Sequence, residues 1–210
     1  MSKKHPVIAV TGSSGAGTTT VKRAFEHIFH RENISSAVIE GDSFHALSRT
    51  EFKTAMKKAE AAGNNHFSHF GPDSNHFDKL EDLFKSYGKN GKGKKRYYLH
   101  SDEEAAQHNK RLGTKLSAGE FTPWEDVPSG TDLLFYEGLH GLVSHGNVDV
   151  SKHVDLGVGV VPVVNPGMDP ENPSRRGRTR LFRRSHCGYH HASHAGLCEL
   201  HHPAIFPHPC

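Results

Sequence analysis

The sequence predicts an α/β fold in which a mostly parallel sheet carries helices on both faces. Continuous apolar runs, typical of strands buried on both sides, recur through the first 164 residues. Segments with helical spacing separate these runs, which favours parallel strands joined by crossover helices. A glycine-rich turn also links the first apolar run to the first helical segment, which is the architecture of a phosphate-binding loop, or P-loop.

Each expected element rests on a local pattern. Apolar residues at spacings of three and four between Val21 and Ile28 indicate the first helix, and Gly63 closes a later, charged one. The expected strands are Val7–Val10, Ser36–Glu40, Tyr97–His100, Asp132–Tyr136 and Leu156–Val164. The expected helices are Thr19–His30, Arg49–Ala62, Lys79–Tyr87 and Glu103–Asn109. Two polar stretches, Asn64–Asp78 and Gly88–Arg96, are expected to be loops, and the second, rich in glycine and lysine, a solvated one.

Length and composition set broad limits on function. The 210 residues are enough for one domain with a real core. A net charge of +3 does not by itself indicate a nucleic-acid partner. No apolar run reaches transmembrane length, and the first five residues lack the apolar stretch of a signal peptide, so a cytoplasmic protein without a membrane partner is expected.

The glycine-rich turn has the features of a phosphate-binding site. Its backbone N–H groups and the adjoining helix would attract phosphate oxygens, and Thr19 holds the position of a hydroxyl that ligates Mg²⁺. Thr18 stands where the P-loop pattern has lysine, so another cation must supply that charge. The alternative is an ordinary glycine-rich turn between a strand and a helix. The candidate ATP-binding residues are Gly12, Ser13, Ser14, Gly15, Ala16, Gly17, Thr18, Thr19 and Thr20.

Two acidic residues come directly after later strands. Because ligands of parallel sheets bind beyond the carboxyl ends of the strands, Asp42 and Glu137 are expected beside the phosphate loop. Asp42 is a candidate general base for an attacking hydroxyl, although an aspartate after a strand also commonly caps the next helix. Glu137 is a candidate for orienting Mg²⁺, against the alternative of a solvated loop glutamate.

Basic and aromatic residues near these acids are candidates for binding a phosphorylated acceptor. His45, Arg49 and Lys53 are spaced by four, so on one helix they would share a face. Tyr98 and His100 alternate on the expected strand and would also share one. A series of charges more often simply solvates a helix, and Tyr98 and His100 are equally compatible with plain surface.

Taken together, the motifs of the first 164 residues resemble the bacterial phosphoribulokinases of the phosphoribulokinase/uridine kinase family, whose fold is that of P-loop kinases. The segments that carry the resemblance are HPVIAVTGSSGAGTTTVK, IEGDSFH, FSHFGPDSNHFDKLE, RYYLH, FTPWED and LLFYEGLHG. The family loop also has threonine at the position of Thr18.

The resemblance implies ATP-dependent phosphorylation of ribulose 5-phosphate, with Mg²⁺, in the Calvin cycle. It assigns Asp42 as the general base and Glu137, with Thr19, to the metal. It assigns the sugar phosphate to a further set, namely His45, Arg49, Lys53, Tyr98 and His100. It also implies assembly into a homo-oligomer.

The remaining residues depart from this pattern. Residues 165–210 hold all three cysteines and many His and Arg residues, with almost no periodic apolar pattern, and are expected to form a disordered tail outside the kinase domain of residues 1–164. If one base is dropped after the codon of Asn165, permitted codons read N-L-E-W-I-Q-K-I-H-R and continue with helical spacing that resembles the family. The tail is therefore interpreted as a frameshift product. The fold is then C-terminally incomplete, without the cations that complete the site, and the chain as written is expected to be inactive or nearly so.

Two other functions remain open from the sequence. One is a uridine-kinase-like nucleoside kinase, whose acceptor would not require Arg49 and Lys53. The other is a non-catalytic module that binds a nucleotide and, through its His/Cys-rich tail, a metal ion or a partner.

Overall fold

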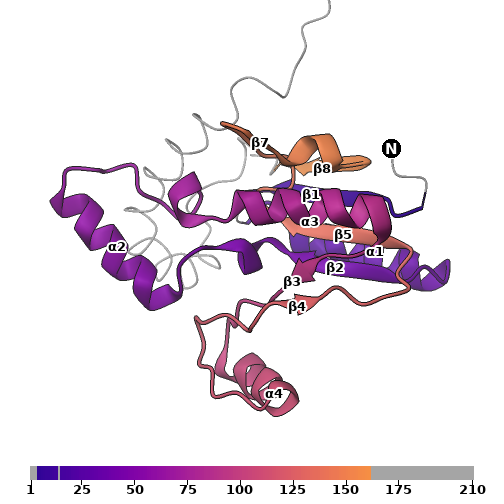
Figure 1. Cartoon of the computed structure of the whole chain (residues 1–210), viewed down its shortest axis with the longest axis horizontal. Helices are drawn as coiled ribbons and strands as arrows, with labels where there is room; N and C mark the ends of the chain where they lie inside the picture. The colour runs from indigo at the N-terminus through magenta and orange to yellow at the C-terminus, as the bar shows by residue number, and fades with distance from the viewer. Residues whose placement is uncertain (1–3, 14, 162–210) are drawn as a thin grey trace, which may run out of the picture.

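A computed structural model of the chain describes residues 4–13 and 15–161. Its centre is a four-stranded parallel sheet, which confirms the predicted fold class (Figure 1). The strands lie in the order β2-β5-β1-β8. Their bounds are Val7–Gly12 for β1, Ser36–Glu40 for β2, Leu133–Gly138 for β5 and Leu156–Val160 for β8. All four carboxyl ends therefore meet at one edge of the sheet.

The register aligns the strand ends that matter for function. Glu40 at the end of β2 lies opposite Glu137 of β5, and Thr11 of β1 lies opposite Gly138. The turn after β1 is therefore next to the acidic end of β5, and β2 ends on the far side of β5.

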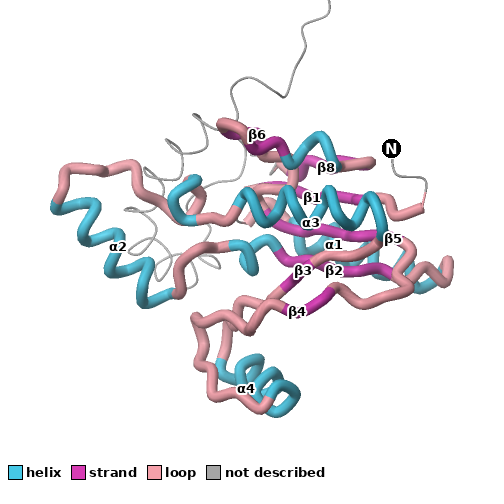
Figure 2. The backbone as a smooth tube through the Cα atoms, viewed as in Figure 1, coloured by secondary structure: helices cyan, strands magenta, loops and turns pink. Residues whose placement is uncertain are grey.

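Helices cover both faces of the sheet, as the sequence predicts (Figure 2). Helix α1, Thr18–Arg31, packs on one face and helix α3, Phe77–Asn90, on the other. Alternate residues of β5 face the two sides: Leu134 and Tyr136 belong to the core under α3, and Leu133 and Phe135 to the core under α1. Burial on both sides explains why β5 begins as a continuous apolar run in the sequence.

The other elements surround this core. Helices α2, Arg49–Ala61, and α4, Asp102–Leu112, extend away from the sheet (Figure 1). Two short hairpins pair β3, Lys94–Lys95, with β4, Glu125–Asp126, and β6, Ser144–His145, with β7, Val148–Asp149. Three 3₁₀ turns complete the described elements: η1, Gly41–Phe44; η2, Pro72–Ser74; and η3, Val150–His153.

Two predicted elements are wrong. Tyr97–His100 is not a strand, since only Tyr98 pairs, through a single bridge to Phe121. The expected solvated loop Gly88–Arg96 is largely structured, because α3 continues to Asn90, Lys94–Lys95 forms β3, and the side chain of Lys95 is buried. The Nζ of Lys95 donates a hydrogen bond to Tyr97 Oη at 2.6 Å, so the buried ammonium group has a partner. The polar pattern of the segment did not predict this burial.

Within residues 4–13 and 15–161, no helix is long and apolar enough to span a bilayer. The predictions for the tail, and the last residues of the strand expected at Leu156–Val164, lie outside the described residues.

Candidate active site

A cleft of about 360 Å³ opens at the carboxyl edge of the sheet. It joins the turn after β1 to the acids that come after β2 and end β5, as the sequence predicts. Its described lining residues are Gly12, Ser13, Gly15, Thr18, Thr19, Lys22, Glu40, Gly41, Asp42, Phe70, His100, Glu104, Glu137, Gly138 and Leu139. Ala16 and Gly17 belong to the same turn and Thr20 to the first turn of α1, and none of the three is among the described lining residues. Ser14 is outside the described residues.

The turn after β1 leaves the start of α1 free to bind an anion. Gly17 is the N-cap of α1 with φ 99°, and among the described residues no side chain caps the helix and no acid lies in its first turn. A Cβ on Gly12 would lie 2.6 Å from the backbone oxygen of Val160, so this position requires glycine. The helix end therefore presents unmasked positive partial charge to the cleft.

Two glycines that line the cleft let the start of η1 pack closely against the end of β5. A Cβ on Gly138 would lie 2.8 Å from the Cα of Gly41, and a Cβ on Gly41 would lie 2.5 Å from the hydroxyl of Tyr136. The Tyr136 hydroxyl accepts a hydrogen bond from the backbone N–H of His140 at 3.2 Å, and burial raises the pKa of this tyrosine. This close packing fixes Asp42, the next residue after Gly41, at the edge of the cleft.

Asp42 faces two histidines and is held ionised. Its Oδ1 lies 3.4 Å from His45 Nε2, and its Oδ2 lies 3.9 Å from His100 Nε2. The hydrogen bond to His45 lowers the pKa of Asp42, and the charges of His45, His100 and His140 add to this effect against the opposing effect of burial. Asp42 caps no described helix, because Glu40 is the N-cap of η1 and Ser48 that of α2.

The predicted acceptor residues come together only in part. Tyr98 lies edge-on to the rings of both His45 and His100, with centroids 6.2 and 4.9 Å apart. Arg49 starts α2 and donates through Nη2 to the backbone oxygen of His100 at 3.4 Å. Lys53 is exposed one turn further along α2.

The expectation that His45, Arg49 and Lys53 share one helix face is wrong, because α2 begins only at Arg49. His45 is instead the C-cap residue directly after η1, and it is the 3₁₀ turn that places its ring against Asp42.

Sequence reasoning missed the ion pair between Lys22 and Glu40. The Nζ of Lys22 lies 2.7 Å from Glu40 Oε1, and the Lys22 side chain is 17% exposed. Burial lowers the pKa of Lys22, but the hydrogen bond and charge of Glu40, with the charges of Glu26 and Glu137, raise it overall. Lys22 is the only lysine or arginine among the described residues that line the cleft. Its spacing of four from Thr18 was the available signal, since that spacing puts both on one face of α1.

Arg96 was also missed, having been assigned to a solvated loop. Its guanidinium donates to the backbone oxygens of Ser43 at 2.8 Å and His45 at 2.5 Å. It lies over the ring of Phe121 at 3.8 Å, and burial lowers its pKa to about 10, which leaves it charged at neutral pH. Arg96 thus ties the turn that carries Asp42 to the segment beyond α3.

The donor set of the cleft fits Mg²⁺ bound in the P-loop manner. The Thr19 hydroxyl and the half-buried Glu137 carboxylate are hard oxygen ligands on the same cleft. Within the part of the chain that the structure describes, no three His, Cys, Asp or Glu side chains form a metal cage. Mg²⁺ needs none, because it is usually held by one or two protein oxygens together with water and substrate phosphates.

The parallel sheet, with the glycine-rich turn after β1 at its carboxyl edge, defines a P-loop α/β fold. The sequence model of the Phosphoribulokinase / Uridine kinase family matches residues 7–168, so the chain belongs to that family.

Within this family, the chain is similar to proteins that are named phosphoribulokinase. The chain is 55% identical over 165 residues to the chromosomal phosphoribulokinase of Cupriavidus necator, covering 79% of this chain and 54% of that one. It is 53% identical over 165 residues to the phosphoribulokinase of Nitrobacter vulgaris, covering 79% and 55%. The solved phosphoribulokinase from Rhodobacter spheroides matches with a TM-score of 0.67 and 38% identity over 90% of this chain and 66% of that one. The chain thus spans about half the length of the curated relatives it matches.

Proposed function

We propose that this chain carries the catalytic cleft of a kinase that transfers the γ-phosphoryl group of ATP to D-ribulose 5-phosphate, giving ribulose 1,5-bisphosphate. The observation that carries the proposal is the single cleft shared by the loop after β1, Asp42 and Glu137. The identity of more than 50% to proteins named phosphoribulokinase supports this acceptor. The proposal includes a cytoplasmic setting, no nucleic-acid or membrane partner, and a homo-oligomer.

Each part of the cleft has a role in this reaction. The backbone amides of residues 12–20 and the start of α1 would hold the ATP phosphates. Asp42, kept ionised by His45 and His100, would accept the proton of the sugar hydroxyl as the hydroxyl oxygen attacks the γ-phosphorus. The bond from the γ-phosphorus to the β,γ-bridging oxygen breaks in the same step, and ADP leaves with that oxygen. In-line transfer depends mainly on positioning and charge stabilisation, so no covalent intermediate is required.

The acceptor would lie between η1 and the start of α2. His45, Tyr98 and His100 form the wall beside Asp42, and Arg49 and Lys53 would bind the sugar phosphate as cations. Thr19 and Glu137 would hold Mg²⁺, which, when bound, neutralises charge on the ATP phosphates.

Single-turnover transfer from γ-labelled ATP, with the 210-residue chain in excess, tests this proposal. We expect the label to be transferred to ribulose 5-phosphate, giving labelled ribulose 1,5-bisphosphate, and none to be transferred to uridine. The rate should be low, because the described cleft holds one lysine against the carboxylates of Glu40, Asp42, Glu104 and Glu137. Asp42→Asn should lower the rate by about 10²–10⁴-fold, the usual worth of a general base.

Arg49→Ala tests the binding of the acceptor separately from the binding of ATP. It should weaken ribulose 5-phosphate binding while ATP binding stays unchanged, since Arg49 lies outside the ATP end of the cleft. Glu60→Ala, an exposed residue near the end of the same helix, is the control. Transfer to uridine in preference to ribulose 5-phosphate, or full activity of Asp42→Asn, would contradict the proposal.

A further inference from the structure

The amide of Asn75 is held in one orientation. Asn75 is 7% exposed, and its Nδ2 donates to the backbone oxygens of His69 at 2.7 Å and Gly71 at 2.8 Å. Backbone oxygens only accept hydrogen bonds, so the atom that faces them must be the amide nitrogen. The other atom of the amide, Oδ1, is therefore an acceptor toward whatever lies on its own side.

The group on that side is the ring of His45. Its Nδ1 lies 2.8 Å from Asn75 Oδ1, and because an amide oxygen cannot donate, Nδ1 must carry the hydrogen. The ring nitrogen on the far side, Nε2, points at Asp42 Oδ1 at 3.4 Å. One buried asparagine thus decides which nitrogen of His45 meets the carboxylate.

We propose that Asn75 is a positioning residue that fixes the ring orientation and the Nδ1–H tautomer of His45, so that Nε2 faces Asp42. With Nδ1–H bound to Asn75, Nε2 is the ring nitrogen that faces Asp42. It donates a hydrogen bond to the carboxylate when the ring is protonated, and it turns a lone pair toward the carboxylate when the ring is neutral. The consequence for catalysis rests on the proposed function, in which Asp42 is the general base, whereas the tautomer itself does not.

Other groups around the ring leave this assignment unchanged. The rings of His69 and Tyr98 contact His45 through their faces and edges, with centroids 5.5 and 6.2 Å away. Arg96 binds the backbone oxygen of His45 rather than its ring. His100 is near the other oxygen of Asp42. Among the contacts in the described residues, Asn75 is the one hydrogen-bond partner of Nδ1.

Long-range ¹H–¹⁵N NMR of the histidine rings in the 210-residue chain tests the proposal, with the pH raised until the ¹⁵N shifts of the His45 ring show its neutral form. Loss of one ring's signals in His45→Gln assigns the residue. We expect the hydrogen of His45 on Nδ1 in the unmodified chain. Asn75→Leu removes the acceptor and should shift the hydrogen toward Nε2, whereas Asn75→Asp keeps an acceptor and should preserve Nδ1–H.

Both Asn75 variants lose the two bonds to His69 and Gly71. They differ in the acceptor, which aspartate keeps and leucine lacks, and in the negative charge that aspartate adds. Ser74→Ala is the neighbouring control: Ser74 is buried, its hydroxyl has no hydrogen-bond partner among the described residues, and its loss should leave the His45 signals in place. A neutral His45 with its hydrogen on Nε2 in the unmodified chain overturns the proposal without any Asn75 variant. So does an unchanged tautomer in Asn75→Leu. None of these readouts depends on phosphoryl transfer, so failure of the kinase assay and failure of this inference are separate results.

Discussion

Lys22 lies one helical turn beyond Thr18, the residue that replaces the usual lysine of the phosphate loop. It lines the cleft and is paired with Glu40 at 2.7 Å, so its ammonium is already held near the expected phosphates. We predict that Lys22→Met weakens Mg·ATP binding by about tenfold, which corresponds to roughly 1.4 kcal/mol. Equilibrium titration with Mg·ATP measures this effect.

Glu40→Gln is the matched variant for that prediction. It removes a negative charge and frees Lys22, so Mg·ATP binding should become tighter. If the ion pair were purely structural, both variants would lower the free energy of unfolding and leave the affinity unchanged, which would contradict a phosphate-binding role for Lys22.

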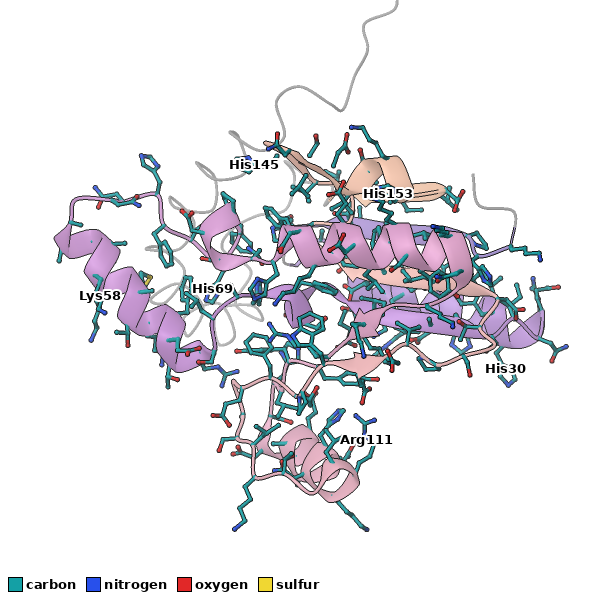
Figure 3. The ribbon with its side chains drawn as sticks, viewed as in Figure 1. His30, Lys58, His69, Arg111, His145 and His153 are labelled. Atoms are coloured by element: carbon teal, nitrogen blue, oxygen red, sulfur yellow. The ribbon has the colours of Figure 1, made fainter. Side chains whose placement is uncertain are left out.

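His69 makes the region beside α2 sensitive to acid. It stacks on Phe52 of α2 with ring centroids 3.3 Å apart and lies on the side of α2 that faces the sheet (Figure 3). Burial, with the nearby charge of His45, lowers the pKa of His69 from 6.5 to about 4. The folded state therefore binds the proton less readily than the unfolded state, and stability is full above pH 6.5 and is lost as the pH falls toward 4.

We predict that His69→Phe removes this loss. The upper limit of the effect is about 3 kcal/mol, since each unit of pKa shift corresponds to about 1.36 kcal/mol. Urea unfolding of both proteins at pH 7 and pH 4.5 measures it, with the exposed neighbour changed in His66→Phe as the control. Equal loss of stability in the His69 variant and the unmodified chain would assign the acid sensitivity to other groups.

Among the elements, the 3₁₀ turn η1 depends on Arg96. Two charge-assisted hydrogen bonds and the rings of Phe121 and Trp124 hold the guanidinium against the backbone of that turn. Arg96→Lys cannot keep both bonds and the stacking, so we predict a loss of about 2–3 kcal/mol in the free energy of unfolding. Chemical denaturation measures it. Lys94→Ala, which removes an exposed pair with Asp126, should cost less than about 1 kcal/mol. A similar loss for both would contradict the anchoring role.

The sequence predicts the functional side chains that lie at the ends of strands. It misses side chains that loops bring back to the site from distant parts of the chain. The four sheet strands are continuous apolar runs, and parallel strands end at one edge, so Asp42 and Glu137 could be placed beside the phosphate loop in advance. Asn75 and Arg96 reach η1 only through loops that return to it from 30 or more residues away. Such contacts leave no periodic pattern. The polar composition around Arg96 even indicated solvent, because the aromatic rings that cover its guanidinium come from a later segment.

Over the whole molecule, the family match extends to residue 168 of 210, and the described cleft contains four carboxylates against one lysine. A triphosphate in such a cleft needs further cations. We propose that they are encoded after Asn165 in the shifted frame, whose first nine residues, L-E-W-I-Q-K-I-H-R, supply lysine and arginine where the tail of this chain departs from the family pattern. The same proposal puts the boundary of the kinase domain at residue 164.

We predict that replacing residues 166–210 by the shifted-frame segment raises the rate of transfer to ribulose 5-phosphate by about 10³-fold or more. An analogous arginine contributes 10³–10⁵ to phosphoryl transfer, because it neutralises the charge that develops on the γ-phosphate. A coupled ADP-release assay compares the two proteins, and the control carries the same replacement segment in scrambled order. Sequencing the DNA around codon 165 tests the lesion directly. Normal turnover by the unmodified 210-residue chain would show that the described cleft needs no further cations, and equal rates with the scrambled control would show that the added segment does not supply them.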